Sequence, residues 1–294
     1  MGLLLLLGRG MNNHANTIHP LAATGGAVMT EDYLQAHQAH DYPRLIERWR
    51  AVARRAGLVV RRIAAAGPQF NLYCVRSRRL PRDGTIYISA GIHGDEPAGT
   101  EALITWAEEN TRLLRRRSFF LVPCINPWGL LNNSRRDSRG RDLNRVFQKD
   151  TVAEIVALKR AIGRRRFALA LTLHEDYDGL GIYIYEIQGV HPYWGEALLE
   201  AARPHLPGDS RTMIESRECA GGLIRRAPDM KLFKQIGLPE ALYLHLQGCP
   251  RVFTIETPSE YGLDRRVRAH VAVIGECVRR ARACGSSTKT PTQC

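Results

Sequence analysis

Residues Gly91–Gly99 read Gly-Ile-His-Gly-Asp-Glu-Pro-Ala-Gly, and they separate two different patterns in the chain. The apolar run Thr85–Ala90 before them predicts a buried strand, and Thr100–Glu109 after them shows the pattern of a helix. His93 and Glu96 therefore lie three residues apart on a predicted strand-to-helix turn. An imidazole and a carboxylate with this spacing can converge on one cation, and ligands of this kind suit zinc. The pair is a weak signal by itself, so its value depends on its position at the end of a strand.

Strand and helix patterns alternate along most of the chain. Strands are predicted at about 58–66, 69–76, 85–91, 118–124, 167–173, 181–187 and 251–256, and helices at about 43–56, 96–109, 151–162, 193–203, 237–246 and 263–284. Continuous apolar runs such as Phe167–Leu173 indicate strands buried on both faces. We therefore expect an α/β fold with a mixed, mostly parallel central sheet flanked by helices. With no internal repeat or clear linker, residues 29–284 are expected to form one domain, with a disordered leader at 1–28 and a disordered tail at 285–294.

The composition is that of a globular protein with a strong positive charge. The chain has 294 residues, a hydrophobic content of 44% and a formal net charge of +13. Most of the positive charge is arginine in clusters scattered along the chain, which indicates a solvated surface more than a nucleic-acid site. No cluster is interleaved with aromatic residues in the manner of a nucleic-acid platform. Specific nucleic-acid binding is therefore not expected.

Cysteine usage and hydropathy indicate the compartment. The seven cysteines are odd in number and form no CxxC pair, so they do not form a disulfide framework. Cys74 and Cys124 lie within apolar strand patterns and are expected to be packed thiols. A reducing compartment, the cytoplasm, is favoured. Leu3–Leu7 is a poor signal peptide, and no run approaches the ~20 apolar residues of a membrane span, so no membrane partner is expected.

Polar residues also follow the ends of other predicted strands, where sites form in α/β folds. His174 ends the run Leu171–Leu173, and a lone histidine there is more often a structural residue. Beside His93 and Glu96 it completes a His/Glu/His set with one open position, which is the usual catalytic zinc arrangement. Glu256 ends an apolar strand, where a partly dry environment raises the pKa of a carboxyl group and suits a general base. The alternative for Glu256 is a capping acid or a salt bridge.

A dense polar cluster follows the predicted strand at 118–124. It begins at Asn126–Gly129 and continues through a segment rich in Asp, Asn and Arg. A solvated loop would account for this composition. However, Asp142, Asn144 and Arg145 offer a carboxylate, an amide and a forked cation within one turn, and arginine holds a carboxylate bidentately.

The ordered set of these motifs resembles the M14 zinc carboxypeptidases and their relatives, the aspartoacylase and succinylglutamate desuccinylase deacylases. The set is HGDE at 93–96, NPxG at 126–129, RxxxxGxDLNR at 135–145, and the strand-end residues His174 and Glu256, over roughly residues 85–260. The resemblance implies one zinc ion per chain, held by His93, Glu96 and His174. It also implies that Glu256 is the general base.

Further roles follow from the same resemblance. Asn144 and Arg145 match the pair that grips a substrate carboxylate, and Asp142 matches the acid that orients the first zinc histidine. Arg135 matches the arginine that polarises the scissile carbonyl. Arg136 is one residue away and is the alternative for that role.

The chain departs from the peptidase pattern in three ways, the first of which is a gap from Glu96 to His174 that is short compared with digestive carboxypeptidases. Glu175 and Asp176 follow the third proposed ligand, where those enzymes usually carry small or polar residues. The substrate-binding tyrosine of the family is not evident, and Tyr243 and Tyr261 are candidates by rough position only.

These patterns predict a zinc-dependent hydrolase of amide bonds, foremost a metallocarboxypeptidase that removes a C-terminal residue from a peptide. The nearest alternative is a deacylase of an N-acyl amino acid, and both substrates would carry a free carboxylate. The alternative of another class is a catalytically dead binding module with a basic surface. The presence of every expected ligand and of Glu256 speaks against that alternative.

Overall fold

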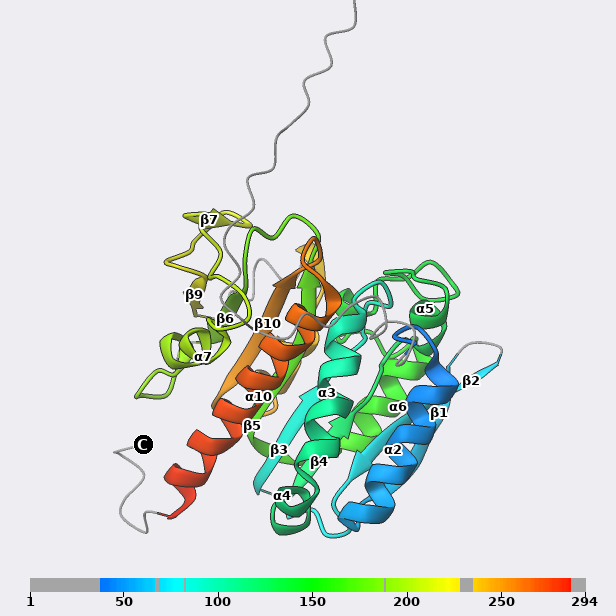
Figure 1. Ribbon diagram of the computed structural model, residues 1–294. Coiled ribbons are helices and arrows are strands. Elements are labelled where there is room, and N and C mark those ends of the chain that lie inside the picture. The colour runs from blue at the N-terminus through cyan, green and yellow to red at the C-terminus, as the bar shows by residue number, and fades with distance from the viewer. Residues whose placement is uncertain (1–37, 67–68, 82, 188, 228–234, 287–294) are drawn as a thin grey trace, which may run out of the picture.

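An eight-stranded sheet forms the centre of the molecule (Figure 1). The computed structural model describes residues 38–286, apart from 67–68, 82, 188 and 228–234. The strand order is β1-β2-β4-β3-β5-β10-β6-β9. In chain order these strands are β1 Val59–Ala66, β2 Phe70–Arg76, β3 Asp83–Ser89, β4 Phe119–Val122, β5 Arg166–Asp176, β6 Tyr183–Ile187, β9 Leu223–Arg226 and β10 Val252–Pro258. The central strands β4, β3, β5 and β10 are parallel, whereas β2 and β6 run antiparallel to them.

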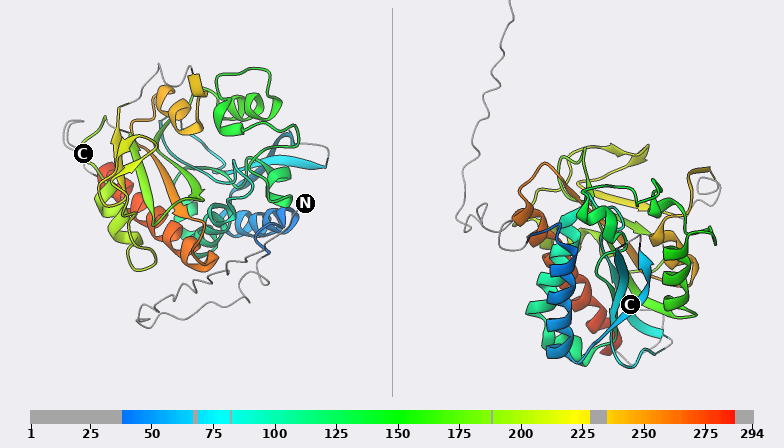
Figure 2. Two further views of the ribbon diagram at one scale, coloured as in Figure 1. Left: turned by 90° about the horizontal axis from the view of Figure 1, so that it is seen from above. Right: turned by 90° about the vertical axis from the view of Figure 1, so that its right-hand side faces the viewer.

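Helices cover both faces of this sheet (Figure 2). One face carries α2 Tyr42–Ala56, α3 Pro97–Glu109, α4 Thr111–Arg116, α5 Pro127–Leu131, α7 Gly195–Ala202 and α10 Leu263–Ser286, and the other carries α6 Ala153–Ile162 and α9 Glu240–Leu246. Successive side chains of a strand point to opposite faces, so Ile86 and Ile88 pack in the first layer and Tyr87 in the second. The predicted α/β fold, with a mixed, mostly parallel sheet flanked by helices, is confirmed.

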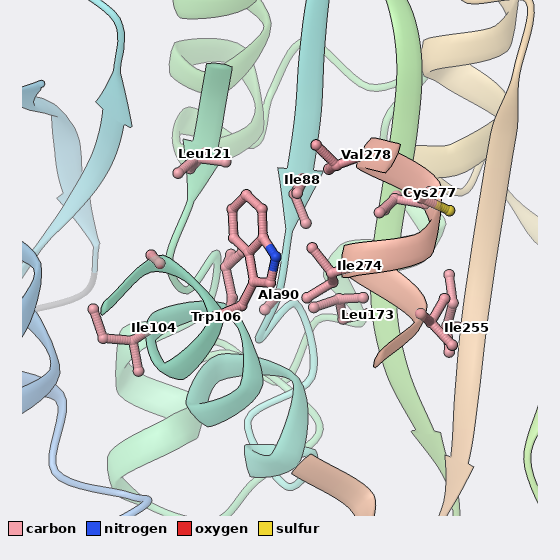
Figure 3. Packing of buried hydrophobic residues seen from close by; sticks show 14 of the residues in the cluster. Ile88, Ala90, Ile104, Trp106, Leu121, Leu173, Ile255, Ile274, Cys277 and Val278 are labelled. Carbon is pink, nitrogen blue, oxygen red and sulfur yellow. The ribbon is translucent and has the colours of Figure 1, made fainter. Parts of the chain in front are cut away.

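The larger core lies between the sheet and helices α2, α3 and α10. Trp49, Trp106 and Ile274 are fully buried in it. Figure 3 shows Trp106 and Ile274 beside Ile88 and Leu173, which belong to β3 and β5. Each large apolar side chain buried here stabilises the fold by roughly 1.5–3 kcal/mol. This packing fixes α3 against the two strands whose ends carry the predicted metal ligands.

The predicted long helices and strands are all present, with their ends shifted by a few residues. Strand β5 runs on to Asp176, past the predicted end at 173, because its pairing with β10 continues that far. The sequence did not predict the short elements α4, α5 and β9. It also did not predict the hairpin formed by β7 Met213–Ile214 and β8 Arg217–Glu218. These segments are too short or too charged to show a period, as in the Leu-Ile-Arg-Arg sequence of β9.

The predicted leader and tail fall mostly outside the described residues. Helix α10 extends to Ser286, so it includes the first two residues of the predicted tail at 285–294. The rest of that tail and the predicted leader at 1–28 lie outside the described residues. The single domain over 29–284 stays a prediction.

Two glycines bring the turn after β3 into backbone contact with the start of α5. The N–H of Gly94 donates to the carbonyl oxygen of Ser134 at 3.0 Å. A Cβ on Gly94 would lie 1.9 Å from the carbonyl carbon of Gly129. The side chain of Asn126 accepts a hydrogen bond from the Gly129 N–H at 2.9 Å and so caps α5. The Asn-Pro-x-Gly motif therefore supports the turn on which the first two predicted ligands lie.

We predict that Gly94→Ala lowers the free energy of unfolding by about 2 kcal/mol or more, because the added methyl group meets backbone atoms that cannot move aside. The control is Gly275→Ala in α10, where a Cβ meets nothing within 4 Å and alanine favours the helix. Urea unfolding of the two variants measures the difference. Equal stability of Gly94→Ala and the wild type would show that the contact is not tight.

Candidate metal centre and substrate pocket

Two imidazoles and one carboxylate meet at the carboxyl ends of β3 and β5. His93 and Glu96 lie on the turn after β3, and His174 lies near the end of β5. Nδ1 of His93 is 2.6 Å from Oε1 of Glu96, and Nδ1 of His174 is 2.9 Å from Oε2 of Glu96. All three side chains are buried, and their ligand atoms lie within 4.8 Å of one another. Two nitrogens and a carboxylate so arranged fit a divalent ion such as zinc, with one position left for water or substrate.

The charges within this cluster compensate one another. Burial opposes ionisation of Glu96, but the positive charges of His93 and His174 and their hydrogen bonds outweigh burial and lower the pKa of Glu96. Burial likewise opposes protonation of His93, but the charge of Glu96 and the hydrogen bond with Asp142 raise the pKa of His93 to about 9. A divalent ion would supply the same positive charge as the imidazoles lose their protons.

Asp142 fixes the orientation of the first imidazole. Its Oδ1 lies 3.1 Å from Nε2 of His93. This contact leaves Nδ1 of His93 on the side of Glu96, which is the orientation that a metal ligand needs. Burial tends to raise the pKa of the Asp142 carboxyl. The hydrogen bond with His93 and the charges of His93, Arg135 and Arg145 outweigh burial, so the pKa lies below its usual value.

Of the two arginines considered for the scissile carbonyl, only Arg135 lies at the cluster. Its Nη1 is 3.2 Å from Oε1 of Glu96, its Nη2 is 3.3 Å from Oδ2 of Asp142, and its side chain is 44% exposed. Arg136 donates instead to the carbonyl oxygen of Gly140 at 2.9 Å and does not line the pocket. The geometry therefore disfavours Arg136 as a substrate-binding residue.

The pocket beside the cluster has one face of the sheet as its floor. In the strand register Glu256 pairs with His174 of β5 and with Tyr183 of β6. Two residues earlier, Thr254 occupies the equivalent place between β5 and β6. Alternate residues of a strand share a face, so the side chains of β5, β10 and β6 enter the pocket together. The cavity has a volume of about 170 Å³.

Glu256 lies in this cavity with the metal cluster. Burial raises the pKa of its carboxyl above the ordinary value, the positive charge of His174 opposes the rise, and the negative charge of Glu96 adds to it. A carboxylate whose proton affinity is raised in this way suits a general base.

Asn144 and Arg145 line the same cavity from the short 3-10 helix Leu143–Arg145. Oδ1 of Asn144 accepts a hydrogen bond at 2.9 Å from the N–H of Glu240, the first residue of α9. The amide NH₂ of Asn144 therefore remains a donor. Together with the Arg145 guanidinium it can bind a carboxylate. Glu240 is itself buried and accepts hydrogen bonds from the hydroxyls of Tyr87 and Ser89, so β3 also supports Asn144.

The tyrosines of the pocket are not those suggested by the sequence. Tyr243 packs on Phe147, and the ring of Tyr261 lies under Arg265; neither lines the cavity. Tyr183 and Tyr185 of β6 line it instead. Their spacing of two in the strand next to Glu256 was a signal available in the sequence, but it required the order of strands in the sheet.

Residues 82–184 match the family described as the succinylglutamate desuccinylase/aspartoacylase catalytic domain. Human carboxypeptidase D is 27% identical over 201 residues, which are 49% of this chain and 15% of that protein. The rat protein of the same name is 27% identical over 187 residues, 44% of this chain and 14% of that protein. The chain thus spans about one seventh of the length of these curated relatives.

Solved structures share most of the chain's architecture. A protein of Shewanella amazonensis SB2B assigned as a metallopeptidase has a TM-score of 0.72 at 22% identity, covering 83% of this chain and 94% of that chain. A metallo-carboxypeptidase of Burkholderia cenocepacia has a TM-score of 0.62 at 16% identity, and the match covers 83% of this chain and 70% of that chain. The protein has a metallocarboxypeptidase-like fold. The resemblance to the zinc carboxypeptidases and their deacylase relatives is therefore confirmed. No helix in the described part of the chain is long and apolar enough to cross a membrane.

Within this metallocarboxypeptidase-like fold, Glu175 braces the two elements that carry the cluster. It follows His174 in β5, and its Oε1 accepts a hydrogen bond at 2.6 Å from the N–H of Ala98, in the first turn of α3. Its other oxygen pairs with Arg266 of α10. Burial raises the pKa of Glu175 to about 7, against the lowering effect of Arg266. The sequence marked Glu175 as a departure from the peptidase pattern but held no signal for this brace.

We predict that Glu175→Gln and Arg266→Gln each weaken Zn²⁺ binding by roughly 10- to 100-fold, the usual effect of losing a residue that orients metal ligands. The brace would loosen while all three donor side chains remain. Glu260→Gln removes an exposed acid and serves as the control. Competition with a chelator measures the affinity, and circular dichroism checks the fold. Unchanged affinity in both brace variants would show that the ligands hold their positions without it.

Proposed function

We propose that the protein is a zinc-dependent hydrolase of amide bonds, and that it acts as a carboxypeptidase on peptides with a free C-terminal carboxylate. One observation carries the proposal: the His93/Glu96/His174 cluster, Glu256 and the Asn144–Arg145 pair all face the same cavity. A metal ligand set, a carboxyl group with a raised pKa and a carboxylate-binding pair are together what such a hydrolase needs.

The residues of the pocket divide the proposed reaction among them. A zinc ion bound at this site would act as a Lewis acid and lower the pKa of a water molecule bound to it toward ~7. Asn144 and Arg145 hold the substrate carboxylate and thereby fix the scissile amide near Glu256. Glu256 accepts the proton of the attacking water and delivers a proton to the leaving amine. Arg135 donates hydrogen bonds to the carbonyl oxygen as negative charge develops on it.

A deacylase of N-acyl amino acids is the second candidate. Its specific support is the match of residues 82–184 to the desuccinylase/aspartoacylase catalytic domain. The cavity of about 170 Å³ is also small, which suits a substrate with a short acyl group. The chemistry would be the same, so the substrate decides between the two. Parallel assays of short peptides, N-acetylaspartate and N-succinylglutamate distinguish them. Inactivity of a zinc-loaded protein on all three would favour a binding module.

Glu256→Gln is expected to reduce kcat by on the order of 10²–10⁴-fold, because an amide cannot accept the proton of the attacking water. The variant should still bind one equivalent of zinc, since Glu256 is outside the ligand set. His174→Ala is the contrasting variant, which should lose the metal as well as activity. Elemental analysis and steady-state kinetics measure both quantities. A near-normal kcat in Glu256→Gln would remove this residue from the mechanism.

Amidation of the substrate's free carboxylate is expected to lower kcat/KM steeply in the wild-type protein. Charge-assisted hydrogen bonds are each worth roughly 1.5–3 kcal/mol, and amidation removes the charge that Arg145 would bind. The penalty should shrink in Arg145→Ala, which has already lost this interaction. If amidated and free substrates react equally fast, the pocket does not recognise a carboxylate, and both the peptidase and the deacylase proposals fail.

A further inference from the structure

Seven arginines line a groove at the end of the molecule opposite the candidate site. Two adjoining cavities of about 460 and 280 Å³, which share Gly57, Leu58 and Arg78, form the groove. We call it the arginine groove, and its arginines are Arg50, Arg54, Arg78, Arg79, Arg115, Arg116 and Arg117. It lies around α4 and the end of α2, at the lower end of the view in Figure 1, whereas the hairpin of β7 and the helix α5 lie at the upper end. The lining residues of both cavities include no Asp or Glu.

The positive charges of the groove are not neutralised within the described part of the chain. None of its seven arginines forms an ion pair there, although arginines elsewhere do, such as Arg48 with Glu101 and Arg211 with Asp209. Partial burial and the positive charge of Arg282 lower the pKa of Arg117, so like charges crowd this region. A cluster of this kind destabilises the fold until an anion occupies it.

Hydrogen bonds to backbone carbonyl oxygens hold the segments of the groove together against this repulsion. The hydroxyl of Ser77 donates to the carbonyl oxygen of Arg117 at 3.1 Å, and the hydroxyl of Ser118 donates to the carbonyl oxygen of Arg79 at 3.1 Å. The side chain of Arg115 ties α4 to α2 through the carbonyl oxygen of Arg55, at 2.7 Å from Nε. The backbone of the groove is therefore preorganised, while most of its guanidinium groups stay exposed.

We propose that the arginine groove binds a multivalent phosphate anion, with an oligophosphate chain as the recognised group. Guanidinium forks match phosphate oxygens bidentately, and several unpaired cations in one groove require an anion with several charges. Neither cavity is lined by an aromatic side chain on which a base could stack. The volumes lie within or close to the range of small-molecule sites. The ligand is therefore a phosphate chain, whether free or carried by a nucleotide.

Isothermal titration calorimetry of the full chain with tripolyphosphate tests the proposal. The test variant is Arg79→Ala/Arg116→Ala, since both side chains are exposed and contact no acid. The matched control is Arg160→Ala/Arg164→Ala, which removes the same charge from exposed positions in and just after α6, on the other face of the sheet. We expect the test variant to bind on the order of tenfold more weakly or worse, and the control to bind like the wild type. Added salt should weaken the binding.

Two further probes identify the source of the phosphate and exclude another ligand. ATP that binds no tighter than tripolyphosphate indicates a free oligophosphate, and tighter binding indicates a nucleotide carrier; both outcomes support a phosphate-binding groove. Unchanged affinity in the Arg79→Ala/Arg116→Ala variant, with an unchanged melting temperature, would overturn the proposal. Tighter binding of a short polyglutamate than of tripolyphosphate would also overturn it, in favour of an acidic polypeptide.

Discussion

The parallel alignment of β3, β5 and β10 is the constraint on which the candidate site depends. Parallel strands end at the same edge of a sheet, so the residues that follow or end them meet there. The register pairs Glu256 of β10 with His174 of β5, and β3 lies on the other side of β5. A shift of one residue would turn His174 or Glu256 to the opposite face. The apolar layers on both faces of the sheet are what hold that register.

Burial of charge explains how the residues of the site differ from one another. Glu96 is compensated by two imidazoles, and Glu175 is compensated by Arg266 and a backbone N–H. The half-buried side chain of Glu256 forms no hydrogen bond or ion pair with any other described residue. The two imidazoles lower the pKa of Glu96, whereas burial raises the pKa of Glu256. At Glu175 burial raises the pKa even though Arg266 opposes the rise. The same local physics thus separates a carboxylate suited to a metal from one suited to proton transfer.

The charge of the molecule is organised differently at its two ends. Around the candidate site, cations and acids alternate in one network, as in the contacts of Arg135 with Glu96 and Asp142. At the arginine groove, hydrogen bonds between neutral groups hold the backbone, and the cations are left without acids. The net positive charge of +13 is therefore not distributed evenly over the surface. Local burial and pairing, more than the total, decide what each end can bind.

The sequence by itself determined the α/β layering and the order of the motifs, because apolar period and strand-end position are local properties. His93, Glu96, His174, Glu256 and the Asn144–Arg145 pair could all be named from it. Only the tertiary structure decided which neighbours reach the pocket. Tyr183 and Tyr185 line it because β6 lies next to β10, and Arg136 does not because its guanidinium bonds to Gly140. The Glu175 brace and the arginine groove join residues far apart in the chain, and such contacts follow from packing, which no local pattern records.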